Sequence, residues 1–134
     1  MAINIVDTLK LARENKKRTK IMDTRKMHAW VHYYPNPGDH DDLHCHPGDQ
    51  TFMCLDGECT MSFPDGGKAV MTVGMVALIE GGSFYKLENT GTGPMILMGT
   101  RTGPTSANKH INYETGKDVL GTRDLVRSAE GGAH

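Results

Sequence analysis

The chain has 134 residues, and its 15 Lys and Arg residues nearly balance 16 Asp and Glu residues, giving a formal net charge of −1. This length suffices for one hydrophobic core, and the near-neutral charge gives no electrostatic basis for binding nucleic acid or an acidic membrane. No apolar run approaches the ~20 residues needed to cross a bilayer, and charged residues interrupt the N-terminal segment where a secretion signal needs an apolar core. We therefore expect a cytoplasmic protein.

The predicted elements begin with a short amphipathic helix over residues 3–14. Its apolar residues Ile3, Val6 and Leu9 lie on one side, whereas charged residues occupy the other. We expect this helix to pack on the outside of the main domain, and we assign residues 1–20 to the helix and the basic connector after it.

After the connector the apolar pattern changes to a period of two residues, which is typical of strands. The first such run, residues 27–34, is aromatic and β-branched, and Pro35 and Pro37 end it. Further strand-like runs, separated by glycine-containing turns, cover residues 50–55, 58–63, 68–73, 75–79, 84–88 and 94–100. Many short strands at this spacing predict an all-β sandwich or barrel over residues 21–103.

Residues 104–134 are polar and lack a clear period. We expect a C-terminal extension that lies over the barrel or over a neighbouring subunit, with residues 128–134 disordered. Neither an internal repeat nor a second domain is predicted.

The most informative segment is His-Cys-His-Pro-Gly-Asp-Gln at residues 44–50. Residues two apart on a strand share a face, so His44 and His46 point the same way and can share a divalent metal ion. Gln50 has the same parity, so its amide oxygen is a candidate third ligand if the kink at Pro47 preserves the register.

Together with two glycines, these residues resemble the first motif of the cupin superfamily. That motif is a glycine, five residues, His-x-His, three or four residues, Glu, six residues and a glycine. This chain matches it with Gln50 in place of Glu and with the remaining positions at Gly38, His44, His46 and Gly57. The resemblance implies a single-domain cupin, a double-stranded β-helix or jelly-roll barrel, here with a short N-terminal helix. It also implies a divalent metal cofactor: manganese, iron, zinc or nickel.

The second cupin motif is matched only in part. Gly74, Gly82 and Asn89 fit its spacing. Glu80, however, replaces its proline, and Tyr85 stands where the family has a further histidine ligand. Tyr85 is therefore either a ligand or a hydrogen-bonding residue of the cavity wall. The first motif, with Gln in the ligand position, is similar to that of manganese-dependent hydroxynitrile-lyase-like cupins, although those proteins keep the later histidine.

The remaining histidines differ in their sequence context. His32 shares the inward parity of Trp30 and Tyr34, so it is a candidate for the missing histidine or for an acid–base group. His40 precedes the first motif and is expected to be an exposed loop residue. The others belong to no constellation and are expected at the surface: His28, His110 and His134.

Two functions remain open. The first is a metal-dependent enzyme that acts on a small organic molecule inside the barrel. Its reaction would be dioxygenase-like, the commonest implication of the resemblance, or a lyase or isomerase reaction in which Tyr85 or His32 moves a proton. The alternative is a non-catalytic small-molecule-binding or sensing cupin with a degenerate metal site. The exposed edges of so small a barrel also predict a homodimer.

Overall fold

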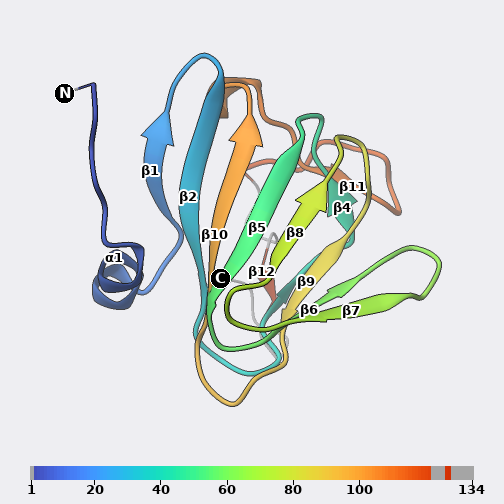
Figure 1. The fold of residues 1–134 in the computed structure, drawn as a ribbon. Helices are drawn as coiled ribbons and strands as arrows, with labels where there is room; N and C mark the ends of the chain where they lie inside the picture. Colours follow the sequence, from blue (N-terminus) through green and yellow to red (C-terminus); the bar gives the residue numbers. More distant parts are fainter. Residues whose placement is uncertain (1, 122–125, 128–134) are drawn as a thin grey trace.

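Two antiparallel sheets face one another in the computed structural model, which describes residues 2–121 and, for the backbone, residues 126–127 (Figure 1). The first sheet has the strand order β1-β2-β10-β5-β8. Its strands are β1 (Thr19–Asp23), β2 (Met27–Tyr34), β5 (Gln50–Asp56), β8 (Val76–Ile79) and β10 (Met95–Thr102).

The second sheet has the order β12-β3-β9-β6-β7. Its strands are β3 (His40–Asp41), β6 (Cys59–Ser62), β7 (Lys68–Met71), β9 (Lys86–Asn89) and β12 (Val126–Arg127). A short ladder joins β4 (His44–Cys45) to β11 (Ile111–Asn112), which follows the 3-10 helix η1 (Thr105–Ala107). An isolated bridge between His44 and Tyr85 connects this ladder to the start of β9.

The core between the sheets follows from the alternation along β2. Its even-numbered residues from His28 to Tyr34 point inward, and Trp30 packs edge-on against Phe52 of β5. Gly99 of β10 lies opposite Trp30 in the ladder, where a Cβ would overlap the indole ring. The glycine therefore lets the largest core side chain lie across the neighbouring strand.

The odd-numbered residues of β2 are also apolar, so the outer face of the first sheet needs a cover. Helix α1 (Thr8–Asn15) provides it, because Ala12 packs with Val31 and Ile96 in a second, outer cluster. The Asp7 side chain caps the helix by accepting a hydrogen bond from the Lys10 N–H, and Lys16 ends it in the left-handed region at φ 54°.

The structure confirms the all-β class and most expected strands, and it corrects three details. The helix begins at Thr8 rather than at residue 3, because Ile3 and Ile5 are exposed and have nothing to pack against. Part of the expected connector forms the edge strand β1, whose pairing with β2 satisfies its backbone. The strand expected at 84–88 begins at Lys86.

Two expectations lie outside the described residues: the disorder of residues 128–134 and the exposure of His134. The assignment of residues 1–20, 21–103 and 104–134 to separate parts of the chain stays a prediction. Within the described part of the chain, no helix has the length and apolar character required to span a membrane.

Candidate metal centre and barrel cavity

Three buried histidines meet between the sheets: His44 in β4, His46 just after it and His110 just before β11. Each offers a possible ligand atom, and these atoms all lie within 4.8 Å of one another. The rings of His44 and His110 are stacked with centroids 3.8 Å apart, and His46 stands nearly perpendicular to both. Three imidazoles at this separation can ligate one divalent ion once the stacked rings of His44 and His110 turn, so that a lone pair of each points at the ion.

Backbone pairing on both sides of β4 brings the three rings together. On one side, His44 exchanges backbone hydrogen bonds of 3.0 and 2.8 Å with Tyr85. On the other side, β11 pairs antiparallel with β4, so that Asn112 lies opposite His44. His110, two residues before Asn112, consequently reaches the cluster from the C-terminal extension.

Hydrogen bonds determine which nitrogen of each ring is left free. Nδ1 of His44 lies 2.7 Å from the carbonyl oxygen of Asp42, and Nδ1 of His46 lies 2.6 Å from that of Lys109. Nε2 of His110 lies 2.6 Å from Oδ1 of Asp42. Because carbonyl and carboxylate oxygens only accept, these nitrogens carry the protons of the neutral rings. The lone pairs are then on Nε2 of His44, Nε2 of His46 and Nδ1 of His110.

The electrostatics of the cluster favour neutral rings at His44 and His46. Burial lowers the pKa of His44 to about 4 and that of His46 to about 2, and the neighbouring His110 and Arg101 add to these shifts. Burial would raise the pKa of Asp42, but hydrogen bonds from His110 and Asn112 lower it to about 2. The site thus combines unprotonated nitrogens with a carboxylate behind one of them, the arrangement in which proteins hold metal-binding histidines. The residues fit a divalent metal ion.

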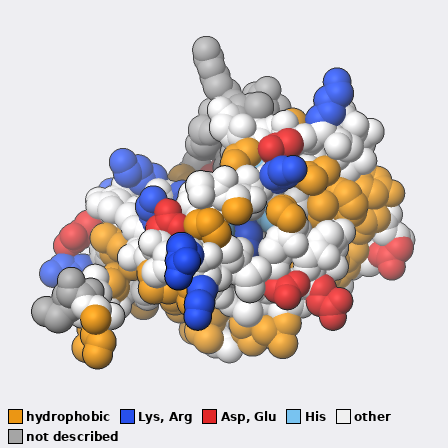
Figure 2. Space-filling model, turned by 90° about the horizontal axis from the view of Figure 1, so that it is seen from above, with side chains coloured by type: hydrophobic (Ala, Val, Ile, Leu, Met, Phe, Trp, Pro, Cys, Tyr) orange, Lys and Arg blue, Asp and Glu red, His pale blue; other side chains and the backbone are white. Residues whose placement is uncertain are grey.

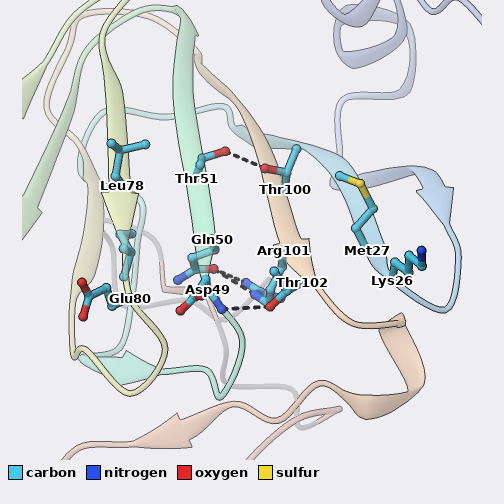
Figure 3. A pocket seen from close by; sticks show the side chains of 11 residues that line it. Lys26, Met27, Asp49, Gln50, Thr51, Leu78, Glu80, Thr100, Arg101 and Thr102 are labelled. Carbon is cyan, nitrogen blue, oxygen red and sulfur yellow. Dashed lines mark hydrogen bonds between the residues drawn. The ribbon is translucent and has the colours of Figure 1, made fainter.

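Gln50 is buried, but it lines a different hollow from the cluster histidines, and its amide oxygen has other partners. Oε1 of Gln50 accepts hydrogen bonds from Nε and Nη2 of Arg101, at 2.9 and 2.7 Å, which Figure 3 shows as dashed lines between β5 and β10. To ligate a metal through this oxygen, Gln50 would have to weaken at least one bond to a charged donor. Its role as a ligand stays a prediction.

Tyr85 and His32 both line the cavity beside the cluster. The ring of Tyr85 lies 4.6 Å from that of His44, between centroids, and burial raises its pKa above the ordinary value. Burial lowers the pKa of His32 to about 3, and its Nδ1 accepts a hydrogen bond of 3.2 Å from Nε1 of Trp30. Both side chains are therefore neutral at physiological pH.

The cavity itself has a volume of about 220 Å³. Its lining includes the three histidines, apolar Trp30, Phe52 and Leu87, polar Tyr34 and Asn108, and two arginines, Arg18 and Arg101. A larger hollow of about 500 Å³ lies at the ends of β5, β8 and β10 and contains none of the cluster histidines (Figure 3). The chemistry of the cluster therefore belongs to the smaller, inner cavity.

The sequence interpretation missed two buried histidines. His110 and His28 were expected at the surface, but they are only 6% and 1% exposed. His110 lies in a segment without periodicity, so only its long-range pairing with β4 reveals its position. His28 has the same parity as Trp30, so the alternation along the strand already indicated that its side chain points inward. His40 lies outside the cluster, and its Nδ1 is 2.8 Å from the carbonyl oxygen of Asp41.

Comparisons with known proteins agree with this architecture. The family model for the cupin domain matches residues 31–100, and no curated protein matches the chain. A Klebsiella pneumoniae protein, an uncharacterized conserved protein with a double-stranded β-helix domain, has 20% identity and a TM-score of 0.68, with 81% of this chain and 96% of that chain covered.

Two further solved structures are similar. A Thermus thermophilus protein has 26% identity and a TM-score of 0.63, with 76% of this chain and 98% of that chain covered. An RmlC-like cupin from Shewanella frigidimarina has 18% identity and a TM-score of 0.58, with 66% of this chain and 76% of that chain covered. These similarities confirm the double-stranded β-helix predicted from the sequence.

Proposed function

This chain belongs to the cupin family, and we propose that its barrel holds a divalent metal ion on His44, His46 and His110 and acts on a small organic molecule beside it. The observation that supports this proposal is the hydrogen bonding of the three rings. Each ring donates its proton to an oxygen of Asp42 or Lys109, which leaves one unprotonated nitrogen on each ring, and a nitrogen of each ring lies within 4.8 Å of a nitrogen of the other two. Among the described residues, no other group of three or more potential ligands has this spacing.

Residues of this chain would position the small molecule and exclude water. Phe52 and Leu87 are almost completely buried and supply apolar walls, whereas Tyr85 faces His44 with a neutral phenol. When bound, the ion would supply a Lewis acid or, if it is redox-active, a one-electron centre. Tyr85 and His32 are the groups we assign to contact the substrate, His32 as a donor through Nε2 and Tyr85 through a hydroxyl that also interacts with Gln50 and Arg101.

Two reaction classes fit this arrangement. A dioxygenase-like reaction needs ligand positions open beside the histidines, whereas a lyase or isomerase reaction also needs a group that moves a proton. The Gln50 motif, similar to that of hydroxynitrile-lyase-like cupins, supports the lyase or isomerase reaction. The pKa of about 3 for His32 supports the dioxygenase-like reaction, because so weak a base accepts a substrate proton poorly at neutral pH.

The neutral state of the cavity side chains also supports the alternative function, a non-catalytic cupin that binds or senses a small molecule. Burial keeps the phenol of Tyr85 and the rings of His32, His44 and His46 neutral at neutral pH. A cavity whose groups hold fixed protonation states is suited to binding with or without turnover.

We further propose that the protein is a cytoplasmic homodimer.

Metal binding tests the proposal directly. Protein purified without added ions is analysed for bound metal, then stripped with a chelator and titrated calorimetrically with Mn²⁺ and Zn²⁺. We expect one ion per chain. His110→Ala should weaken binding at least tenfold, because two remaining neutral ligands compete poorly with water.

His40→Ala is the matched control, since His40 lies nearby in sequence but outside the cluster, and it should bind metal as the parent does. Gln50→Ala tests the other candidate ligand. A loss of affinity in Gln50→Ala with none in His110→Ala would move the third ligand to Gln50. Failure of the parent to bind any divalent ion would overturn the proposal.

A further inference from the structure

Arg101 is a buried cation that has no carboxylate partner in the described part of the chain. It is 4% exposed, and its guanidinium bonds to Oε1 of Gln50 and to Nε2 of His28, neither of which belongs to a carboxylate. It also lies 4.5 Å from the centroid of the Trp30 ring. Burying a charge is costly unless an opposite charge compensates it, so this position favours the arrival of an anion.

A second guanidinium increases the positive charge at the same place. Arg18 is exposed as a residue, yet its guanidinium lies 4.8 Å from the centroid of Trp30 and lines the cavity. Asp41 is the acidic residue in the lining of this cavity, and its Oδ1 accepts a hydrogen bond from the backbone N–H of Leu87. Asp42, behind the cluster, bonds to His110 and Asn112.

Two uncharged side chains add hydrogen-bonding atoms that lack partners among the described residues. These atoms are Nε2 of His32 and the hydroxyl oxygen of Tyr34, both buried and on residues that line the cavity. Because Nδ1 of His32 accepts the indole N–H of Trp30, the proton of the neutral ring is on Nε2. The cavity therefore offers donors that need an acceptor.

We propose that the cavity binds a small organic carboxylate, with its negative group at Arg101 and its apolar body against Phe52 and Leu87, while Nε2 of His32 and the Tyr34 hydroxyl supply further hydrogen-bonding groups along the cavity wall. The donors and the uncompensated charge select an anionic acceptor. The volume of about 220 Å³ is below the ~300 Å³ at which drug-sized pockets begin, so the molecule is small. This inference deepens the proposed function, because the carboxylate would lie in the cavity that contains the histidine cluster.

Trp30 provides the measurement, since it is the single tryptophan of the chain and both arginines lie over its ring. Benzoate is titrated into metal-free and Zn²⁺-loaded protein while tryptophan fluorescence is recorded. Phenylacetate and acetate are tested in parallel, and benzamide serves as the neutral isostere. We expect saturable quenching by at least one carboxylate, at least tenfold tighter than by benzamide.

Variants then locate the carboxylate. Arg101→Gln should weaken binding at least tenfold, whereas Arg13→Gln, which removes an exposed arginine paired with Asp56, should leave it unchanged. Tyr34→Phe removes only the unpartnered hydroxyl, so we expect this variant to fold. It therefore provides a second test if Arg101→Gln does not fold. It should weaken binding severalfold, with an unchanged circular dichroism spectrum.

The outcomes separate this inference from the metal proposal. His110→Ala should lose metal but still bind the carboxylate when metal-free, and Tyr34→Phe should bind metal as the parent does. No saturable binding of any carboxylate at 10 mM, roughly the weakest affinity of interest, overturns the inference. Equal binding of benzamide, or unchanged binding in both Arg101→Gln and Tyr34→Phe, overturns it too. Displacement by chloride or inorganic phosphate at equal concentration would contradict the choice of an organic carboxylate.

Discussion

Asp42 organises two of the three histidines through different atoms. Its carbonyl oxygen holds Nδ1 of His44, and its carboxylate holds Nε2 of His110 while Asn112 donates to the other carboxylate oxygen. A carboxylate behind a metal-binding imidazole orients the ring and raises its basicity. Asp42 therefore acts on the site without itself being a proposed ligand.

This arrangement predicts the effect of Asp42→Asn. The carbonyl contact to His44 survives, but the charged acceptor for His110 is lost, so Zn²⁺ affinity should fall about 10- to 100-fold. Isothermal titration calorimetry measures the change. Asp65→Asn, in a surface turn where the carboxylate accepts the Gly67 N–H, is the control. Equal affinity in the two variants would show that Asp42 does not support the ligand.

Burial of His32 predicts how stability depends on pH. The pKa of His32 is lowered from 6.5 to about 3, so the folded state binds fewer protons than the unfolded state between these values. Its contribution to stability is complete above pH 6.5 and is lost as the pH falls toward 3. Between pH 7 and 5 this loss is about 2 kcal/mol.

The measurement is urea denaturation of His32→Asn and the parent at pH 7 and pH 5. The variant has nothing to protonate at this position, so its free energy of unfolding should fall by about 2 kcal/mol less than that of the parent. His40→Asn, which removes a histidine outside the cavity, is measured in parallel as the control. An unchanged pH dependence in His32→Asn would mean that the buried ring is protonated in the folded state.

At the scale of elements, β10 carries much of the inner architecture. It pairs with both β2 and β5, and it places Gly99 under Trp30 and Arg101 beside Gln50. The first of these positions requires a residue without a side chain, and the second supplies the charge in the cavity. A change at Gly99 should therefore disturb the strand and the cavity together.

Gly99→Ala tests this arrangement. The added methyl overlaps the Trp30 ring, so we expect a loss of about 1–3 kcal/mol in the free energy of unfolding and a shifted tryptophan emission spectrum. Gly93→Ala is the matched control, because a Cβ there meets no atom within 4 Å. It should change stability by no more than about 0.5 kcal/mol. Similar effects of the two substitutions would contradict the close approach at Gly99.

At the scale of the whole molecule, the outer face of the first sheet is only partly covered. Helix α1 covers one part, but Met53 and Val76 lie opposite each other in the β5–β8 ladder with 43% and 48% exposure, and Leu78 follows at 78%. Hydrophobic side chains form several patches between charged ones on the surface in Figure 2. An apolar row on an edge strand favours association with a second copy.

The proposed homodimer is tested by Val76→Glu. A charge buried in the interface should shift the mass measured by light scattering at micromolar concentration from that of a dimer to that of a monomer. Val70→Glu is the control, because Val70 has nearly the same exposure, 51%, but lies on β7 in the other sheet. A parent protein that is monomeric over a wide range of dilution would rule out the dimer.

The sequence by itself determined what depends on periodicity within one element. Alternation along residues 27–34 identifies Trp30 and Tyr34 as inward residues, and the His-x-His spacing places His44 and His46 on one face. Motif spacing identifies Tyr85 as a cavity residue. These inferences hold because a strand has a period of two residues whatever lies beside it.

Only the tertiary structure decided which distant residues complete the site. His110 reaches the cluster through the pairing of β11 with β4, and Arg101 meets Gln50 across β10 and β5, a separation of 51 residues along the chain. No local pattern encodes such contacts, because they depend on which strands become neighbours and in what register. The segment around β11 has no period of its own, so its position follows from its pairing with β4.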